Sequence, residues 1–223
     1  MKKIVYSVLF ISSLAFSQKE VAVGNFTKIT SFDQIDVLLI KTEGTPKVVL
    51  NGSGSEDVEI IEKNFELKIR MPLLKLLKGD NVTATVYYTT PIAQFEANEG
   101  SRIASSDEFL GKSLRMIAKE GSEIKLKIIT DKLNIRATNG SSISLSGRAK
   151  NQEIVLNTAG NYEGSKLNTM QTTISSNTGG NATVNASDFV TATIFAGGTI
   201  FIHGNPKKTT QKITAGGKIE EVK

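Results

Sequence analysis

The sequence predicts an all-β protein, built as a parallel β-solenoid of about six to seven coils with an N-terminal β-strand cap. Three observations lead to this class. Beyond the first 20 residues, apolar and polar residues alternate with a period of two, and no long segment has the helical period of 3.6. From residue 100, glycines recur every 18–21 residues, and each of the first six is followed by a small polar residue. A period near 20 residues made of short strands is typical of a solenoid. The repeating glycines are Gly100, Gly121, Gly140, Gly160, Gly180, Gly198 and Gly217.

The composition favours a scaffold over an enzyme. The chain has 223 residues, 39% of them hydrophobic and 22% charged, which suits one folded domain. It has no cysteine and a single histidine, which argues against disulfides, thiolate catalysis, a lipoprotein anchor and the usual zinc centres. No cofactor is expected. The net charge of +5 is small and scattered, so a nucleic-acid partner is not expected either.

The first 17 residues have the features of a secretory signal peptide. Lys2 and Lys3 precede an apolar run over residues 4–16, and small residues at positions 15 and 17 suit cleavage after Ser17. The run is too short to cross a bilayer as a helix. No later segment approaches 18 consecutive apolar residues, so the mature chain is predicted to lack a transmembrane segment and to be exported to the periplasm, the cell surface or the medium.

The mature chain, residues 18–223, is predicted to be one domain in two parts. Residues 18–91 contain strand patterns at 26–40, 47–50, 65–71 and 82–89 and are expected to form the β cap. Residues 92–223 form the coils. The leucine-rich segment 73–77 is expected to fold over the open end of the solenoid, although contact with a membrane or partner is an alternative.

Each repeat is interpreted as a strand, a tight glycine turn, a second strand and a polar corner. Ile103, Ile124 and Ile143 each lie three residues after a glycine, so they should stack in one inward column between parallel neighbours. The residues directly after the glycines are expected to stack in a ladder whose side chains bond one another. An antiparallel sandwich with regular hairpins is the alternative fold. The expected ladder consists of Ser101, Ser122, Ser141, Asn161, Asn181 and Thr199.

Three segments resemble one known family, the putative auto-transporter adhesin, head GIN domain family. They are residues 24–37, with Gly24-Asn25-Phe26 and Phe32-Asp33-Gln34; the strand Val86-Tyr87-Tyr88; and residues 196–206, with Ala196-Gly197-Gly198 and Gly204-Asn205-Pro206. The resemblance covers nearly all of the mature chain. It implies an exported protein of Gram-negative bacteria with a solenoid-like β fold, and it brings no catalytic residues and no established ligand. The insertion at residues 73–77 and the missing lipid-anchor cysteine depart from many members.

Carboxylates are the main candidates for a functional site. Glu99 and Glu120 occupy the same phase of the repeat, which suggests a calcium site or an acid pair, but solvated surface carboxylates are the commoner case. No metal is therefore expected. Asp107, Asp131 and Asp188 share a rough corner phase, where a carbohydrate-active enzyme would place its acids. Two further residues are considered: Tyr162, in a turn, as a platform for a sugar, and His203 as an ordinary corner residue.

The function predicted from these features is an exported, non-enzymatic solenoid of the cell envelope with a binding, adhesive or structural role. Flat sides rich in Thr, Ser and Asn suit weak multivalent contacts with a glycan or another envelope protein. A carbohydrate-active β-helix enzyme and a self-assembling envelope protein are the alternatives. An enzyme would gather two or three carboxylates in one groove, whereas a binding protein would present a polar face.

Overall fold

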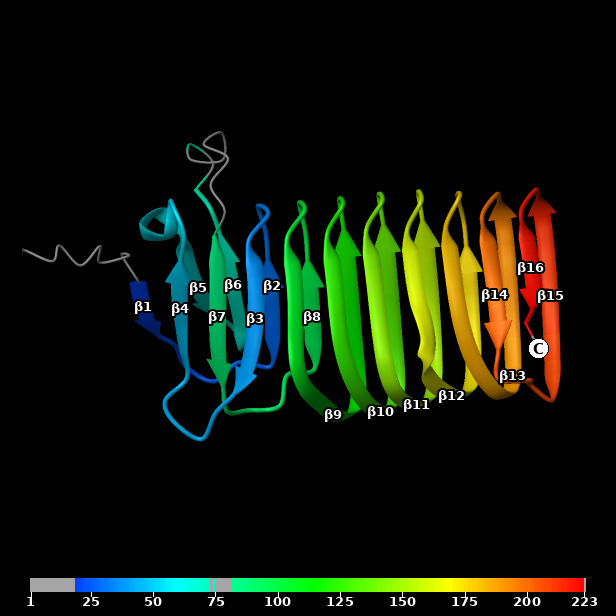
Figure 1. Ribbon diagram of the computed structural model, residues 1–223, viewed down its shortest axis with the longest axis horizontal. Helices are drawn as coiled ribbons and strands as arrows, with labels where there is room; N and C mark the ends of the chain where they lie inside the picture. The colour runs from blue at the N-terminus through cyan, green and yellow to red at the C-terminus, as the bar shows by residue number, and fades with distance from the viewer. Residues whose placement is uncertain (1–18, 73, 75–81, 223) are drawn as a thin grey trace, which may run out of the picture.

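The structure is a computed structural model that describes residues 19–72, 74 and 82–222. The predicted signal peptide and most of the leucine-rich segment 73–77 lie outside the described residues. Apart from a short 3-10 helix, the described chain is almost entirely β and winds into a parallel solenoid of about seven turns (Figure 1). None of the helices in the described part of the chain has the length and apolar character needed to cross a membrane.

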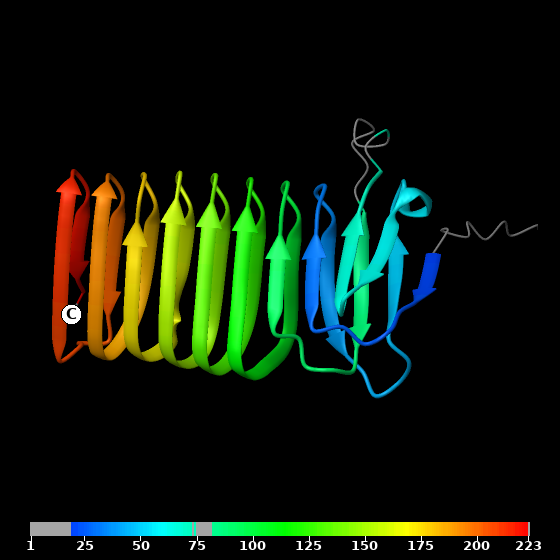
Figure 2. The same cartoon turned by 180° about the vertical axis from the view of Figure 1, so that it is seen from behind.

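Five long strands form the regular part of the solenoid. Each bends near its middle, so that its first half lies in one face of a flattened coil and its second half lies in the opposite face (Figures 1 and 2). Neighbouring strands are parallel and share one register except for local shifts before or at the bend, which confirms the predicted solenoid and excludes the sandwich. The strands are β9 (Arg102–Lys119), β10 (Glu123–Thr138), β11 (Ser142–Asn157), β12 (Asn161–Ser176) and β13 (Asn181–Ala196).

The expected N-terminal cap also contains solenoid coils. Four strands before residue 91 pair in parallel with their neighbours and add two turns: β2 (Lys28–Ser31), β3 (Asp36–Lys41), β6 (Glu66–Arg70) and β7 (Thr83–Tyr88). The turn between β2 and β3 has positive φ at Asp33 and Gln34, as the later turns do, but no glycine marks it in the sequence. These four strands of the expected cap therefore share the parallel pairing of the later coils.

The antiparallel cap is smaller than expected. It consists of β1 (Lys19–Ala22), β4 (Lys47–Asn51), the 3-10 helix η1 (Ser55–Asp57) and β5 (Glu59–Lys63). β6 and β7 lie between this cap and the coil formed by β2 and β3, so the chain runs back over itself before it continues into β8 (Gln94–Ala97). Antiparallel strands end the stack because they close the N-terminal edge of each face.

The opposite end of the solenoid is formed by β14 (Thr199–His203), β15 (Lys208–Ala215) and β16 (Lys218–Glu221). Gly204, Asn205 and Pro206 separate β14 from β15, so the bend is broken in this coil. Ile213 pairs in register with the fully buried Ile194, yet 46% of Ile213 is exposed because no described coil follows it. Charged side chains line this edge, among them the exposed Lys208, Lys212, Lys218 and Glu221.

The inward residues form one continuous apolar core. Ile103, Ile124 and Ile143 are register partners and are completely buried, which confirms the predicted column. In the next coils the same position holds Tyr162 and Ala182. The glycine turns stack as well: the N–H of Gly100 donates to the carbonyl of Glu120 at 2.8 Å, and the N–H of Gly121 donates to that of Asn139 at 3.0 Å. Turns and core therefore repeat together.

The predicted ladder divides into two columns. Ser142 pairs with Asn161, so Ser141 stacks on Gly160, because the turn of this coil is made by Thr158 and Ala159, one residue earlier than expected. The first column therefore contains Ser101, Ser122, Ser141, Gly160, Gly180 and Gly198, whereas Asn161, Asn181 and Thr199 belong to the next column with Arg102, Glu123 and Ser142.

The buried serines bond mainly to backbone rather than to one another. Ser122 Oγ donates to the carbonyl of Ala97 and Ser141 Oγ donates to that of Ala118, both at 2.7 Å. Ser31 and Ser101 are the exception, with their hydroxyls 2.8 Å apart. Each serine thus joins its coil to the preceding one.

Truncating the central isoleucine should destabilise the protein strongly. Ile124→Ala removes a completely buried side chain between two buried isoleucines, and the expected loss in the free energy of unfolding is about 2–5 kcal/mol. Denaturant unfolding measures this loss. Lys125→Ala, at the exposed next residue, is the control and should change stability by less than about 0.5 kcal/mol. Equal losses for the two variants would contradict the inward column.

Introducing serine in place of Gly160 should also destabilise the protein, although serine occupies this column in the preceding coils. A Cβ at Gly160 would lie 2.2 Å from the carbonyl oxygen of Ala137, so the coils would have to separate. We expect Gly160→Ser to cost about 1–3 kcal/mol in thermal or denaturant unfolding. Ala159→Ser, on the exposed turn, is the matched control. A stability gain in Gly160→Ser would mean that the serine column continues.

Candidate binding groove

A groove of about 670 Å³ follows the solenoid axis along the corner where the long strands bend. Each of four successive strands gives it three consecutive residues, an outward wall residue on either side of a small floor residue. This pattern arises because side chains alternate in direction along a strand and register partners stack from coil to coil. The triplets are 110–112 in β9, 129–131 in β10, 148–150 in β11 and 168–170 in β12, and Asn185 and Ser187 extend the groove onto β13.

The floor of the groove consists of the small central residues of these triplets. Gly111, Thr130, Ala149 and Thr169 are register partners, and the last three are each 5% exposed. The hydroxyls of the threonines are bonded to the chain itself: Thr130 Oγ1 donates to the carbonyl of Lys132 at 3.0 Å, and Thr169 Oγ1 donates to that of Asn185 at 2.8 Å. These hydrogen bonds hold the two threonine side chains in place on the floor.

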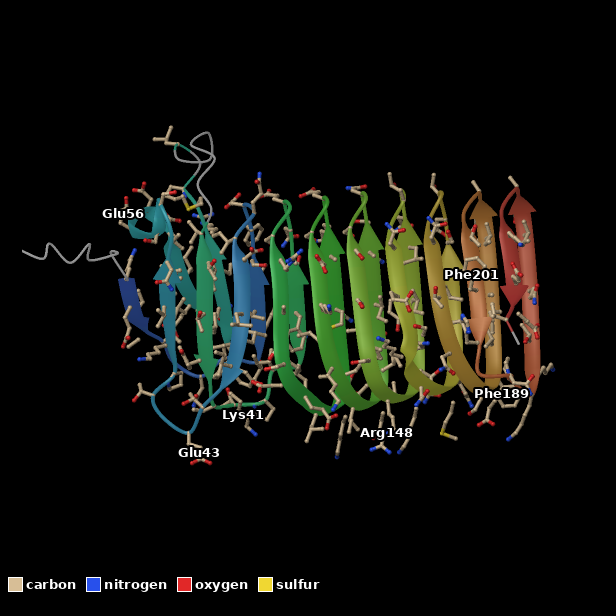
Figure 3. The ribbon with its side chains drawn as sticks, in the orientation of Figure 1. Lys41, Glu43, Glu56, Arg148, Phe189 and Phe201 are labelled. Carbon is tan, nitrogen blue, oxygen red and sulfur yellow. The ribbon has the colours of Figure 1, made fainter. Side chains whose placement is uncertain are left out.

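The walls change in character along the axis. Leu110 is 59% exposed at the β9 end, and Ile129 follows it in the same wall. Arg148 comes next and points away from the solenoid on its lower edge in Figure 3. At the β13 end the wall is polar, since the Asn185 side-chain amide donates to Asn168 Oδ1 at 3.2 Å. The groove therefore runs from an apolar end to an amide-rich end.

The second wall carries paired charges. Asp131 lies between Lys112 and Lys150, its partners in register, and Lys150 Nζ is 2.7 Å from its carboxylate. The hydrogen bond and charge of Lys150, with the charge of Lys112, hold the pKa of Asp131 below its usual value. This carboxylate therefore stays ionised and neutralises part of the positive charge. Met170, 48% exposed, follows in the same wall.

The corner carboxylates do not converge. Asp107 accepts from the backbone N–H of Lys41 at 2.6 Å, Asp131 pairs with Lys150, and Asp188 pairs with Lys207 at 2.7 Å. Each acid is therefore engaged by a different partner. Only Asp131 lines the groove.

Glu99 and Glu120 lie on the exposed turn side, where both occupy the first turn position together with Asp33. Asp33 accepts from the N–H of Met71 at 2.8 Å. A hydrogen bond with Asp33, partial burial and the negative charges of Asp33 and Glu120 raise the pKa of Glu99 to about 7. Within the described residues, no three His, Asp or Glu side chains are arranged to hold a metal ion.

The prediction for Tyr162 was wrong. Its ring is buried in the inward column, and its hydroxyl donates to Gln152 Oε1 at 2.9 Å. Gly164 leaves the space for this ring, since a Cβ there would lie 2.5 Å from the tyrosine hydroxyl. Burial raises the pKa of Tyr162. Tyr162 is therefore a core residue, and His203 ends β14 as a half-buried register partner of Asn185.

Sequence reasoning missed the groove. Its signal is present as three aligned residues per repeat, at spacings of 19, 19 and 20 from residue 110 to 168, with a small residue at each centre. Finding it requires the register at the bend, which the glycine turns do not define.

Comparison with known protein families gives one match. The family model described as "Putative auto-transporter adhesin, head GIN domain" matches residues 25–206. No curated protein matched.

Several solved structures share the fold. A putative adhesin from Bacteroides fragilis has 17% identity and a TM-score of 0.84, over 94% of this chain and 98% of that one. A putative adhesin from Parabacteroides merdae has 18% identity and a TM-score of 0.74, over 93% and 96%. A putative lipid binding protein from Parabacteroides distasonis has 13% identity and a TM-score of 0.68, over 93% and 96%.

Glu99 should make the protein less stable as the pH rises. Its pKa of about 7 lies above the ordinary value of 4.5, so the folded state binds more protons than the unfolded state between these values, and stability falls as the pH rises through this window. Glu99→Gln should therefore be more stable than the wild type at pH 8, by no more than about 1 kcal/mol because the site is exposed, and similar at pH 4. Thermal melts across this range test it, with the exposed Glu153→Gln as control. A pH-independent difference would contradict the shift.

Proposed function

The chain belongs to the putative auto-transporter adhesin, head GIN domain family, and from this premise we propose that it is an exported, non-enzymatic binding protein of the cell envelope. It binds a linear glycan along the groove at the bend of the solenoid. Export rests on the predicted signal peptide, from which the mature chain would begin at Gln18.

The groove is the observation that carries this proposal. It crosses five parallel strands at their regular spacing of about 4.8 Å, so it presents one set of lining residues per coil. A ligand made of repeating units can form one set of contacts per coil. Many weak contacts of this kind give adhesion its strength through multivalency.

The arrangement of acids favours binding over hydrolysis. Glycosidases place two carboxyl groups across one bond of the substrate, about 5–10 Å apart. Here Asp131 is the groove's carboxylate among the described residues, and it is bound to Lys150. A pair of acids facing the groove would have supported the enzymatic alternative.

A lipid ligand is the second candidate. The apolar side chains of Leu110, Ile129 and Met170 line the groove, and one protein of the same fold is named as a putative lipid binding protein. An acyl chain would fit the β9 end. It would leave the cations and amides of the central and β13 coils without a role, which makes the glycan the better match.

The proposal predicts glycan binding without turnover. The mature chain, residues 18–223, is applied to a glycan array and to immobilised polysaccharides, and the same polysaccharides are incubated with it and analysed for new chain ends. We expect weak binding to single chains and retention on dense surfaces that is stronger by on the order of 10²–10⁴-fold. No binding to any glycan, or the release of shortened chains, would contradict the proposed function.

A further inference from the structure

The groove is positively charged in spite of its apolar end. Its lining contains three cationic residues, Lys112, Arg148 and Lys150, and one carboxylate, Asp131, which leaves a formal charge of +2. Asp131, the carboxylate of this lining, already forms an ion pair with Lys150. A ligand that complements the remaining charge must be anionic.

Arg148 is the cation most available to a ligand. In the described part of the chain it forms no ion pair or side-chain hydrogen bond, and it is exposed. It lies in β11, the central strand of the groove, directly after Gly147. A Cβ on Gly147 would lie 2.1 Å from the carbonyl oxygen of Ile128, and its φ is +110°, so glycine is needed there. Arg148 is therefore held at the middle of the groove by a constrained backbone.

The anion that fits this position is planar or tetrahedral with several oxygens. A guanidinium group donates two parallel hydrogen bonds to a carboxylate or a sulfate. Lys150 is two residues further along the same strand, on the opposite side of Ala149. Lys112 lies two coils away, which is about 10 Å along the axis. Anionic groups can therefore be met at intervals along the groove.

The direction and pitch of the groove favour a sugar chain over a peptide. The backbone of β10 is bonded to β9 and β11 on both sides of the bend, so an extended peptide finds no free strand edge to pair with. A peptide also advances about 3.3 Å per residue, which is out of step with coils about 4.8 Å apart. One pyranose unit in an extended chain has nearly the length of one coil spacing.

We propose that the groove binds a linear acidic polysaccharide, carrying carboxylate or sulfate groups, along the solenoid axis, with Arg148 as the principal anion contact. This inference rests on the proposed glycan-binding function and names its ligand class. Lys112 and Lys150 contact further anionic groups. The amides of Asn168 and Asn185 face the hydroxyls, and Leu110, Ile129 and Met170 pack against the apolar faces of the sugar rings.

The test compares charged and neutral polymers on the mature chain. Polygalacturonate and chondroitin sulfate are the acidic probes, dextran is the neutral one, and affinities are measured by biolayer interferometry at 50 and 300 mM NaCl. We expect at least one acidic polymer to bind more tightly than dextran and to weaken at the higher salt concentration. Arg148→Glu should weaken this binding about 10-fold or more, because it replaces a charged donor with a repelling group.

Lys125→Glu is the matched control. It changes the charge by the same two units on β10, at an exposed position outside the groove lining, and should leave the affinity unchanged. Thermal melts should show that both variants fold like the wild type, since both side chains are exposed. Arg148→Lys keeps the charge and should retain part of the affinity.

Four results would overturn the inference. Dextran bound as tightly as the acidic polymers, or acidic binding that Arg148→Glu leaves unchanged, would leave the proposed glycan-binding function standing without this ligand class. Binding to phosphatidylglycerol vesicles, but to none of the polysaccharides, would assign the groove to a lipid. Loss of acidic binding by Arg148→Glu and Lys125→Glu alike would show a general charge effect. If the glycan array is also empty, the proposed function fails too.

Discussion

The rest of this structure depends on the parallel, in-register stacking of coils at the spacing of hydrogen-bonded strands. Each residue lies on its equivalent in the next coil, so the same type of residue recurs at that position along the axis. Ile103, Ile124 and Ile143 form a column for this reason, and the turn carbonyls accept from the turns beside them. The same constraint makes small changes costly: where the column changes from Ser141 to Gly160, the coils approach so closely that a Cβ no longer fits.

A stack of this kind has two ends, and the chain treats them differently. At the N-terminal end the pairing is antiparallel: β1 pairs with β4, β4 with β7, and β5 with β6. The chain folds back here, so that β6 and β7 lie outside β2 and β3. At the other end Ile213 is left half exposed, and Gln211 donates across the coil to Glu221 at 3.1 Å. Polar and charged residues there reduce the cost of exposing the final strands to water.

The groove follows from the bend in each long strand. Small floor residues between outward neighbours create a channel wherever the bends align, and its chemistry is then decided by a few wall residues. The apolar, cationic and amide-rich portions succeed one another along the axis, from Leu110 through Arg148 to Asn185. A scaffold of repeated coils can in this way change its ligand through surface substitutions that leave the core unaltered.

The sequence by itself determined the class of fold, the parallel coils and the isoleucine column, because glycine spacing and two-residue alternation are local consequences of turn and strand geometry. It also suggested the family. Only the tertiary structure decided the register at Gly160, the coils hidden in residues 28–88, the burial of Tyr162 and the groove. The turn at Asp33 and Gln34 has positive φ without a glycine, so the glycine spacing does not reveal it. The turn at Thr158 and Ala159 comes one residue before its glycine, so the glycine spacing misplaces it. Register is set by contacts between coils some 20 residues apart. Unlike turn propensity, these contacts cannot be inferred from any short segment of the sequence.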